Sequence, residues 1–471
     1  MDDWFDYILD HTRSQPEAPA AVMEDRVVTY GMLGAAIDAC ARRLAAQNFA
    51  ADDVVALCIA DPIRHLTLGL ALFRIGIRAI SIEPAHRGLS ALSFSALVGD
   101  EAARKHFPAA RLLPLTDDWF NPATAPAVAL AEPFSGGRTI WRYSLTSGTT
   151  GEPKMLATPL EYVGRNVLPG NAIYGCARTL PMLGLTSIWG FTAACCALAS
   201  RRTVYFATSP FQAVRMIELF GIDLVFAGTE QLVALVRAAR KTGATVDSLR
   251  TVIVGGSQMT RALAEAAALH LCKDVRNRYG SSEVGMISEV PAREAVSRPG
   301  YAGRVAPGVE IAAFRPDGRP CAPGEAGNVM SRVRRARGAA PDPWVDHGDF
   351  GWIDADGAIV ILGRTAEIGD LSAPAAREVS PVHEVEHLLR LEWDAADAAA
   401  VMVEGDGAAP EIWVGAVDCK DADAAVLQGL MRGRGIAGTV RLFHLQAVPR
   451  GANGKVQRGA LAAALRAAAA L

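Results

Sequence analysis

Short apolar runs alternate with helical segments between residues 54 and 270, and this alternation limits the possible folds more than any other feature. The runs lie at residues 54–60, 77–84, 203–207, 223–228 and 251–256. Each run is short for a helix and mostly apolar, which is typical of a strand buried on both faces. Because helical segments separate successive runs, the sequence predicts parallel strands joined by right-handed crossovers, and hence an α/β fold.

The pattern changes near residue 300. Short alternating segments with Gly, Pro and Asp turns follow, which predicts a smaller β-rich unit. After Arg364 comes a stretch that suits a linker, and the last hundred or so residues carry helix and strand signals. We therefore predict an N-terminal domain over residues 1–364, built of parallel βα-layered sheets plus the β-rich subdomain. A small α+β C-terminal domain would cover 365–471, with the hinge at about 364–370.

Composition and charge exclude several classes of protein. With 51% hydrophobic and 21% charged residues and a net charge of −3, the chain gives no electrostatic reason to bind nucleic acid. The N-terminus carries acids where a secretory signal carries bases. Segment 186–200 is the most apolar, but it is shorter than the ~20 residues of a membrane span. We expect a cytoplasmic protein without a membrane span, whose eight scattered cysteines are buried thiols.

A loop rich in Gly, Ser and Thr runs from Tyr143 to Met155, YSLTSGTTGEPKM. Glycines leave backbone N–H groups unshielded, hydroxyls add donors, and a lysine adds positive charge, so the loop suits an oligophosphate. A run of this kind, taken alone, is more often a solvated surface loop. Lys154 supplies the positive charge in this loop.

Four further polar segments stand out. RYGSSEVG at 278–285 contains Glu283, a carboxylate that suits magnesium. DHGDFGW at 346–352 places Asp349 between glycines, where it could accept hydrogen bonds from the vicinal hydroxyls of a ribose. Arg364 ends a predicted strand, and Lys455 lies in the glycine-flanked turn PRGANGKVQR. Each segment alone fits an ordinary turn or surface charge.

Together, the motifs SLTSGTTGEPK, YGSSE, GD, GR and NGKVQR, in this order, resemble those of the adenylate-forming superfamily. That superfamily comprises acyl- and aryl-CoA synthetases, adenylation domains of peptide synthetases and firefly luciferases. The likeness covers nearly the whole chain and includes LRTVIVGGSQM at 249–259. It implies a large N-terminal domain and a small, mobile C-terminal lid that rotates between two half-reactions. In the first, a carboxylate and ATP give an acyl-adenylate and pyrophosphate; in the second, a thiol or another nucleophile takes the acyl group.

The resemblance also implies roles for the motif residues. In the Gly-rich loop, the residues that would wrap the β- and γ-phosphates of ATP are Thr146, Ser147, Gly148, Thr149, Thr150 and Lys154. Ser282, where the family usually has threonine, would touch the α-phosphate, and Glu283 would serve Mg²⁺. The adenine and ribose would lie against Tyr279, Asp349 and Arg364, with Ser257 and Gly280 completing the nucleotide site. Lys455 would bridge the carboxylate and the α-phosphate in the transition state. The catalytic residues implied are Lys455, Glu283 and Ser282.

The sequence departs from the family pattern at the hinge and in the acid pocket. The usual GRxDD and the glycine loop after it are replaced by GRTAEIGDLSAPAAREVSP, with Ala366 at the expected pivot. This puts thioester formation with CoA in doubt, but not adenylation. The segment LPMLGLTSIWGF aligns with the pocket region. Gly184 stands there where acyl-CoA synthetases often place histidine, and Leu185 where amino-acid-activating domains carry aspartate. An acid without an α-amino group is therefore expected, because an unpaired buried ammonium is costly.

Three functions remain open from the sequence. The first is an ATP- and Mg²⁺-dependent ligase that makes a CoA thioester of an acyl or aryl acid. The second keeps adenylation but delivers the acyl group to a separate carrier protein or to an amine. The third is a non-catalytic family member that binds a nucleotide or an acyl ligand. Intact Lys154, Glu283, Asp349 and Lys455 weigh against the third.

Overall fold

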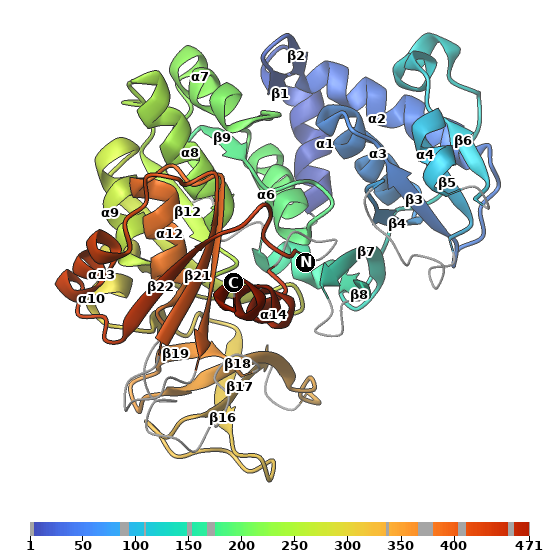
Figure 1. Cartoon of the computed structure of the whole chain (residues 1–471). Coiled ribbons are helices and arrows are strands. Elements are labelled where there is room, and N and C mark those ends of the chain that lie inside the picture. The colour runs from blue at the N-terminus through green and yellow to red at the C-terminus, as the bar shows by residue number, and fades with distance from the viewer. Residues whose placement is uncertain are drawn as a thin grey trace. The chain divides into compact units, whose positions relative to one another are not determined.

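The computed structural model describes residues 4–84, 94–107, 110–147, 153–166, 175–335, 339–365, 380–403, 411–450 and 456–470. The chain forms two compact units (Figure 1). Unit 1 comprises Met1–Phe226 and Ser248–Arg250, and unit 2 comprises Ala227–Asp247 and Thr251–Leu471. Each unit is described by itself. The predicted boundary at 364–370 stays a prediction, and residues 366–370 lie outside the described part of the chain.

The first sheet of unit 1 has the strand order β6-β5-β3-β4-β7-β8. Its strands are parallel except for the last pair, β7 and β8, which form an antiparallel hairpin. The predicted strand–helix–strand unit at 54–84 is confirmed as β3, α3 and β4. The elements of this region are α2 (Tyr30–Ala45), β3 (Val54–Cys58), α3 (Pro62–Arg74), β4 (Arg78–Ser81), β5 (Ala96–Gly99), α4 (Glu101–His106), β6 (Leu112–Pro114), β7 (Ile140–Ser147) and β8 (Pro153–Pro159).

A second set of strands in unit 1 has the order β11-β9-β10-β1-β2, parallel except for β1 with β2. The apolar segment at 186–200 forms α6, a helix with almost all of its residues buried. Among the described residues, no helix is long and apolar enough to cross a membrane. The remaining elements are α1 (Trp4–Ser14), β1 (Pro19–Met23), β2 (Arg26–Thr29), β9 (Arg178–Pro181), α6 (Ile188–Ala199), β10 (Thr203–Tyr205), α7 (Pro210–Phe220) and β11 (Leu224–Gly228).

The core of unit 1 contains a cluster of aromatic rings. Trp141 on β7 packs at 5.4 Å between ring centroids from Phe73 on α3, and at 5.7 Å from Phe191 on α6. Trp4 on α1 joins them at 5.8 Å from Trp141. These rings bury large apolar areas and fix α3 and α6 against β7.

Unit 2 begins with βα units and continues with a β-rich part. Strand β12 is parallel to β13, and β13 forms a hairpin with β14. An antiparallel sheet of order β15-β19-β18-β17-β16 follows, which confirms the β-rich unit predicted from residue 300. These elements are α8 (Thr229–Thr242), β12 (Thr251–Gly255), α9 (Arg261–His270), β13 (Asp274–Ser281), β14 (Gly285–Pro291), α10 (Ala292–Ser297), β15 (Tyr301–Arg304), β16 (Val309–Phe314), β17 (Gly327–Val333), β18 (Val345–Ile353) and β19 (Ala358–Arg364).

The C-terminal part of unit 2 is an α+β arrangement around the sheet β20-β21-β22. Strand β20 is antiparallel to β21, whereas β22 is parallel to β21. The helix and strand signals predicted for this part of the chain correspond to α12, β20 and β21. The elements are α12 (Val382–Glu392), β20 (Asp397–Val403), β21 (Glu411–Val417), α13 (Ala424–Gly433), β22 (Thr439–His444) and α14 (Arg458–Ala469).

Helix α12 is joined to α9 by buried polar contacts. The Glu384 carboxylate accepts hydrogen bonds from the N–H groups of Arg261 (2.7 Å) and Ala262 (2.8 Å), in the first turn of α9. His387 Nδ1 lies 2.8 Å from the Oγ1 of Thr260, the N-cap residue of α9. A negative carboxylate at a helix N-terminus satisfies free N–H groups and complements the helix dipole.

We expect Glu384→Ala to lower the free energy of unfolding by about 2 kcal/mol, because two buried N–H groups lose their acceptor. Thermal and denaturant unfolding measure the change. Glu392→Ala, an exposed position at the end of the same helix, is the matched control and should change stability little. Equal effects of the two substitutions would contradict this account of the contact.

Candidate functional site

The buried carboxylate of Asp349 lies at the centre of the predicted nucleotide site in unit 2. Asp349 is on β18 and is 7% exposed. Its Oδ2 accepts a hydrogen bond from the hydroxyl of Tyr279 (2.8 Å), and its Oδ1 accepts one from Arg364 Nη1 (2.8 Å). Each carboxylate oxygen can accept more than one hydrogen bond. Asp349 therefore retains acceptor capacity for a pair of vicinal hydroxyls.

Backbone geometry brings Arg364 to this carboxylate. Asp349 and Arg364 are direct partners in the register of β18 and β19. Arg364 Nη1 also donates to the carbonyl of His347 (2.7 Å). Gly348, which lies between His347 and Asp349, has a φ of +67°. A Cβ on this residue would lie 3.5 Å from Arg364 Nη2. The left-handed backbone conformation favours glycine at this position in β18, whereas the space beside Arg364 would admit a Cβ.

Tyr279 comes to the site from the end of β13. Burial and the neighbouring Asp349 carboxylate raise the pKa of Tyr279 well above its usual value. The phenol therefore stays protonated and serves as a hydrogen-bond donor. Its ring meets that of His347 edge to face, with 6.5 Å between the centroids.

His347 is a residue that sequence reasoning missed. Burial lowers its pKa, so the imidazole is neutral near pH 7, and its Nε2 lies 2.7 Å from Ser331 Oγ. The position of His347 inside the DHGD motif, next to a predicted site residue, was the available signal.

The turn between β13 and β14 carries the residues predicted for the α-phosphate and the metal. Glu283 is exposed there and Ser282 is half-buried. Gly280 lies at an irregularity in the β13–β14 pairing, and a Cβ on it would come within 2.4 Å of the Gly285 carbonyl oxygen, so only glycine fits. In the described part of the chain, no group of three or more His, Cys, Asp or Glu side chains could hold a metal ion. A single exposed carboxylate fits Mg²⁺ that keeps waters and substrate oxygens as its other ligands.

The other predicted nucleotide contacts are placed only in part. The Gly-rich loop connects β7 to β8 in unit 1, where Thr146 pairs with Lys154 and Ser147 with Pro153 in the register. Gly148, Thr149 and Thr150 lie outside the described residues. In unit 2, Ser257 is exposed just after β12 and follows Gly256, whose φ is +89°.

Lys455 also lies outside the described residues, but both ends of its turn are described. Arg450 forms a β-bridge with Val456, and the Gln457 N–H donates to the Pro449 carbonyl (2.9 Å). Arg450 makes a two-pronged contact with Asp397 at 2.7 and 2.5 Å. The base of the turn is therefore closed by backbone bonds and a guanidinium–carboxylate pair.

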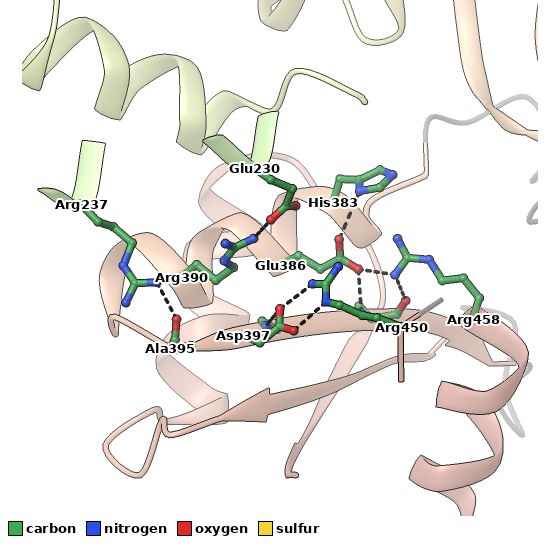
Figure 2. Close-up of polar contacts among 11 residues, drawn as sticks. Glu230, Arg237, His383, Glu386, Arg390, Ala395, Asp397, Arg450 and Arg458 are labelled. Carbon is green, nitrogen blue, oxygen red and sulfur yellow. Dashed lines mark hydrogen bonds and ion pairs between the residues drawn. The ribbon is translucent and has the colours of Figure 1, made fainter. Parts of the chain in front are cut away.

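A second guanidinium fixes the chain just beyond the turn. Figure 2 shows Arg458 contacting Glu386 of α12, and Arg458 also donates to the Ala400 carbonyl (2.6 Å). Burial alone would raise the pKa of Glu386, but hydrogen bonds and charge from His383 and Arg458 lower it to about 2. Glu386 is therefore a fixed negative charge that holds Arg458, three residues after Lys455.

Comparison with known proteins agrees with these motifs. The family model described as AMP-binding enzyme matches residues 132–335. The p-hydroxybenzoic acid–AMP ligase of Mycobacterium tuberculosis is 28% identical, over 94% of this chain and 66% of that protein. The 2-succinylbenzoate–CoA ligase of Geobacillus kaustophilus is 26% identical, over 94% of both chains. Residues 132–335 therefore form an AMP-binding domain of the adenylate-forming superfamily, and the chain is similar to ligases of that superfamily over most of its length.

Solved structures of this superfamily share the fold of the chain. The amide bond synthetase of Marinactinospora thermotolerans superposes with a TM-score of 0.77, at 22% identity, over 97% of this chain and 98% of that one. The O-succinylbenzoate coenzyme A synthetase of Bacillus subtilis in complex with AMP gives the same TM-score and identity, over 97% of both chains. The predicted α/β fold is confirmed.

In this protein we expect Tyr279→Phe to weaken AMP binding by roughly fivefold, because Asp349 loses one of the two donors that orient it. Isothermal titration with AMP measures the loss. Tyr301→Phe changes a buried tyrosine on β15 and should leave the affinity unchanged. Unaltered AMP affinity in Tyr279→Phe would contradict a role for this hydroxyl.

Proposed function

We propose that this protein activates a carboxylic acid with ATP and then transfers the acyl group to a thiol, with coenzyme A as the first candidate. In the first step a carboxylate oxygen bonds to the α-phosphorus while the bond to pyrophosphate breaks. In the second step the thiolate attacks the acyl carbon, and AMP leaves. The observation that carries the proposal is Asp349, held by Tyr279 and Arg364 with acceptor capacity left for a ribose.

Phosphoryl-type transfer needs positioning and charge neutralisation more than covalent chemistry. In this proposal Asp349 and Tyr279 bind the nucleoside, and the Gly-rich loop with Lys154 binds the leaving phosphates. Glu283 holds Mg²⁺, which neutralises phosphate charge when it is bound. Ser282 contacts the α-phosphate. Lys455 stabilises the charge that develops between the acid and the α-phosphate.

The identity of the acyl acceptor is the part of the proposal for which another candidate has the most support. Relatives include a fatty acid–[acyl-carrier-protein] ligase of Streptomyces coeruleorubidus, 26% identical over 86% of this chain, besides the CoA ligases. The chain also lacks the usual hinge sequence after Arg364. A separate carrier protein or an amine is therefore the second candidate acceptor. The third candidate function is nucleotide binding without catalysis.

A panel of acyl and aryl acids, assayed for pyrophosphate release with and without coenzyme A, tests the proposal. We expect at least one acid to support release, and Lys455→Ala to lower the adenylation rate by about a hundredfold or more. Lys420→Ala, an exposed lysine in the same C-terminal part, is the control. No turnover with any acid, or full adenylation by Lys455→Ala, would overturn the mechanism. Product formed only with a carrier protein or an amine would favour the second acceptor.

The acid should carry no α-amino group. Leu185 is buried, and its carbonyl oxygen accepts a hydrogen bond from the positively charged Arg142 guanidinium (2.6 Å). A substrate ammonium close to Leu185 would be repelled by this guanidinium, and Leu185 itself supplies no carboxylate to pair with it. We expect phenylpropionate to be preferred over phenylalanine by about a hundredfold or more in pyrophosphate exchange. Robust exchange with α-amino acids alone would refute this.

A further inference from the structure

Arg142, in the middle of β7, is fully buried in unit 1 although it carries a positive charge. Its Nη2 donates to Ser81 Oγ (2.7 Å) and to the Leu185 carbonyl oxygen (2.6 Å). Its guanidinium carbon lies 4.0 Å from the centre of the Phe191 ring. Nε and Nη1, by contrast, have no hydrogen-bond partner in the part of the chain that the structure describes.

The charge of Arg142 has no counter-ion among the described residues. Burial lowers the pKa of Arg142 to about 10, which still leaves it protonated at neutral pH. Burial, together with the charge of Arg142, lowers the pKa of the neighbouring His65 to about 3, and burial raises the pKa of the Cys195 thiol, so both neighbours are uncharged. An unpaired buried charge is expensive, and proteins rarely keep one without a partner or a ligand.

Two more unpartnered polar atoms lie on the same face of the β7–β8 hairpin. Thr158 stands directly opposite Arg142 in the register, and Ser144 is two residues further along β7. Cross-strand partners and residues two apart point to the same face. Both side chains are 1% exposed, and neither Ser144 Oγ nor Thr158 Oγ1 has a hydrogen-bond partner among the described residues. Donors therefore line one buried face, next to an uncompensated charge.

This face leads towards the Gly-rich loop. Arg142 lies four residues before Thr146 on the same strand, which corresponds to about 13 Å of extended chain. A buried water could satisfy single hydroxyls, but it cannot neutralise a guanidinium. A carboxylate can satisfy the hydroxyls and also neutralise the charge. It accepts several hydrogen bonds, and it pairs with two N–H donors along the edge of the planar guanidinium.

We propose that Arg142, with Thr158 and Ser144, is a specificity subsite for a second anionic group, a carboxylate at the far end of the substrate acid. The proposal rests on the proposed function. The Leu185 carbonyl, in the irregular segment between β9 and α6, occupies one guanidinium nitrogen in the free protein. The substrate carboxylate accepts hydrogen bonds from Nε and Nη1, which have no partner among the described residues, while the Leu185 carbonyl keeps its bond to Nη2.

The test compares matched acids that differ only in the far end. Straight-chain α,ω-dicarboxylates of increasing length are compared with monocarboxylates of the same lengths, and p-carboxycinnamate with p-methylcinnamate. For the full-length enzyme we expect kcat/KM for pyrophosphate release to favour the charged-tail acid of suitable length by about tenfold or more. Equal or better use of all neutral-tail acids would overturn the proposal.

Variants separate the subsite from a purely structural role. Arg142→Gln should abolish the preference for the charged tail, whereas a structural defect would lower both members of each pair equally. Thr158→Val keeps the shape of the side chain and should reduce the preference about threefold. Thr179→Val, which also changes a buried threonine with an unpartnered hydroxyl but lies on β9, should leave it unchanged. Unchanged selectivity in both Arg142→Gln and Thr158→Val would refute the assignment.

Failure of the proposed function is distinguishable from failure of the subsite. If no acid of either kind supports pyrophosphate release, calorimetric titration of the same acid pairs into the AMP-bound protein still reports on Arg142. Tighter binding of the charged-tail acids, lost in Arg142→Gln, would support the subsite without catalysis. Binding that does not distinguish the pairs would overturn it.

Discussion

The hydrogen-bonded carboxylate of Asp349 is the interaction on which the site in unit 2 depends. It is buried, and a buried charge is tolerated only when donors compensate it. The two donors come from different sheets, because Tyr279 lies near the end of β13 and Arg364 ends β19. Asp349 thus ties the βα part of unit 2 to its antiparallel part. The same contacts orient its oxygens, so binding of a nucleoside would need little rearrangement.

Helix α12 connects two other parts of unit 2 through neighbouring acids. Glu384 caps α9, whereas Glu386, two residues on, binds Arg458 beside the lysine turn. Arg390, further along the helix, pairs with Glu230 of α8 (Figure 2). The base of the turn that carries Lys455 is therefore built on a helix that is itself fixed to α8 and α9. The described chain on either side of Lys455 is therefore held in place within unit 2.

Much of the fold was predictable because it depends on local patterns. The apolar runs of β3, β11 and β12 mark strands buried on both faces, and the turn residues after 300 mark antiparallel strands. Helix α13 and strand β22 were missed, since their apolar residues are sparse: only two side chains of α13 are buried. Asp349 and Tyr279 could be singled out from their motifs, but their direct hydrogen bond could not, because they are separated by 70 residues. Arg142 could not be recognised at all, since nothing in the sequence WRYS indicates that its charge is buried without a partner.

The central claim is that a carboxylate oxygen of the substrate attacks the α-phosphorus of ATP. Turnover of an acid whose carboxylate carries ¹⁸O, followed by mass spectrometry of the products, tests this step directly. The mechanism predicts one ¹⁸O atom in AMP, because the bridging oxygen stays with the α-phosphate when the acyl group leaves. Label in orthophosphate with release of ADP would show attack at the γ-phosphorus and would contradict the account.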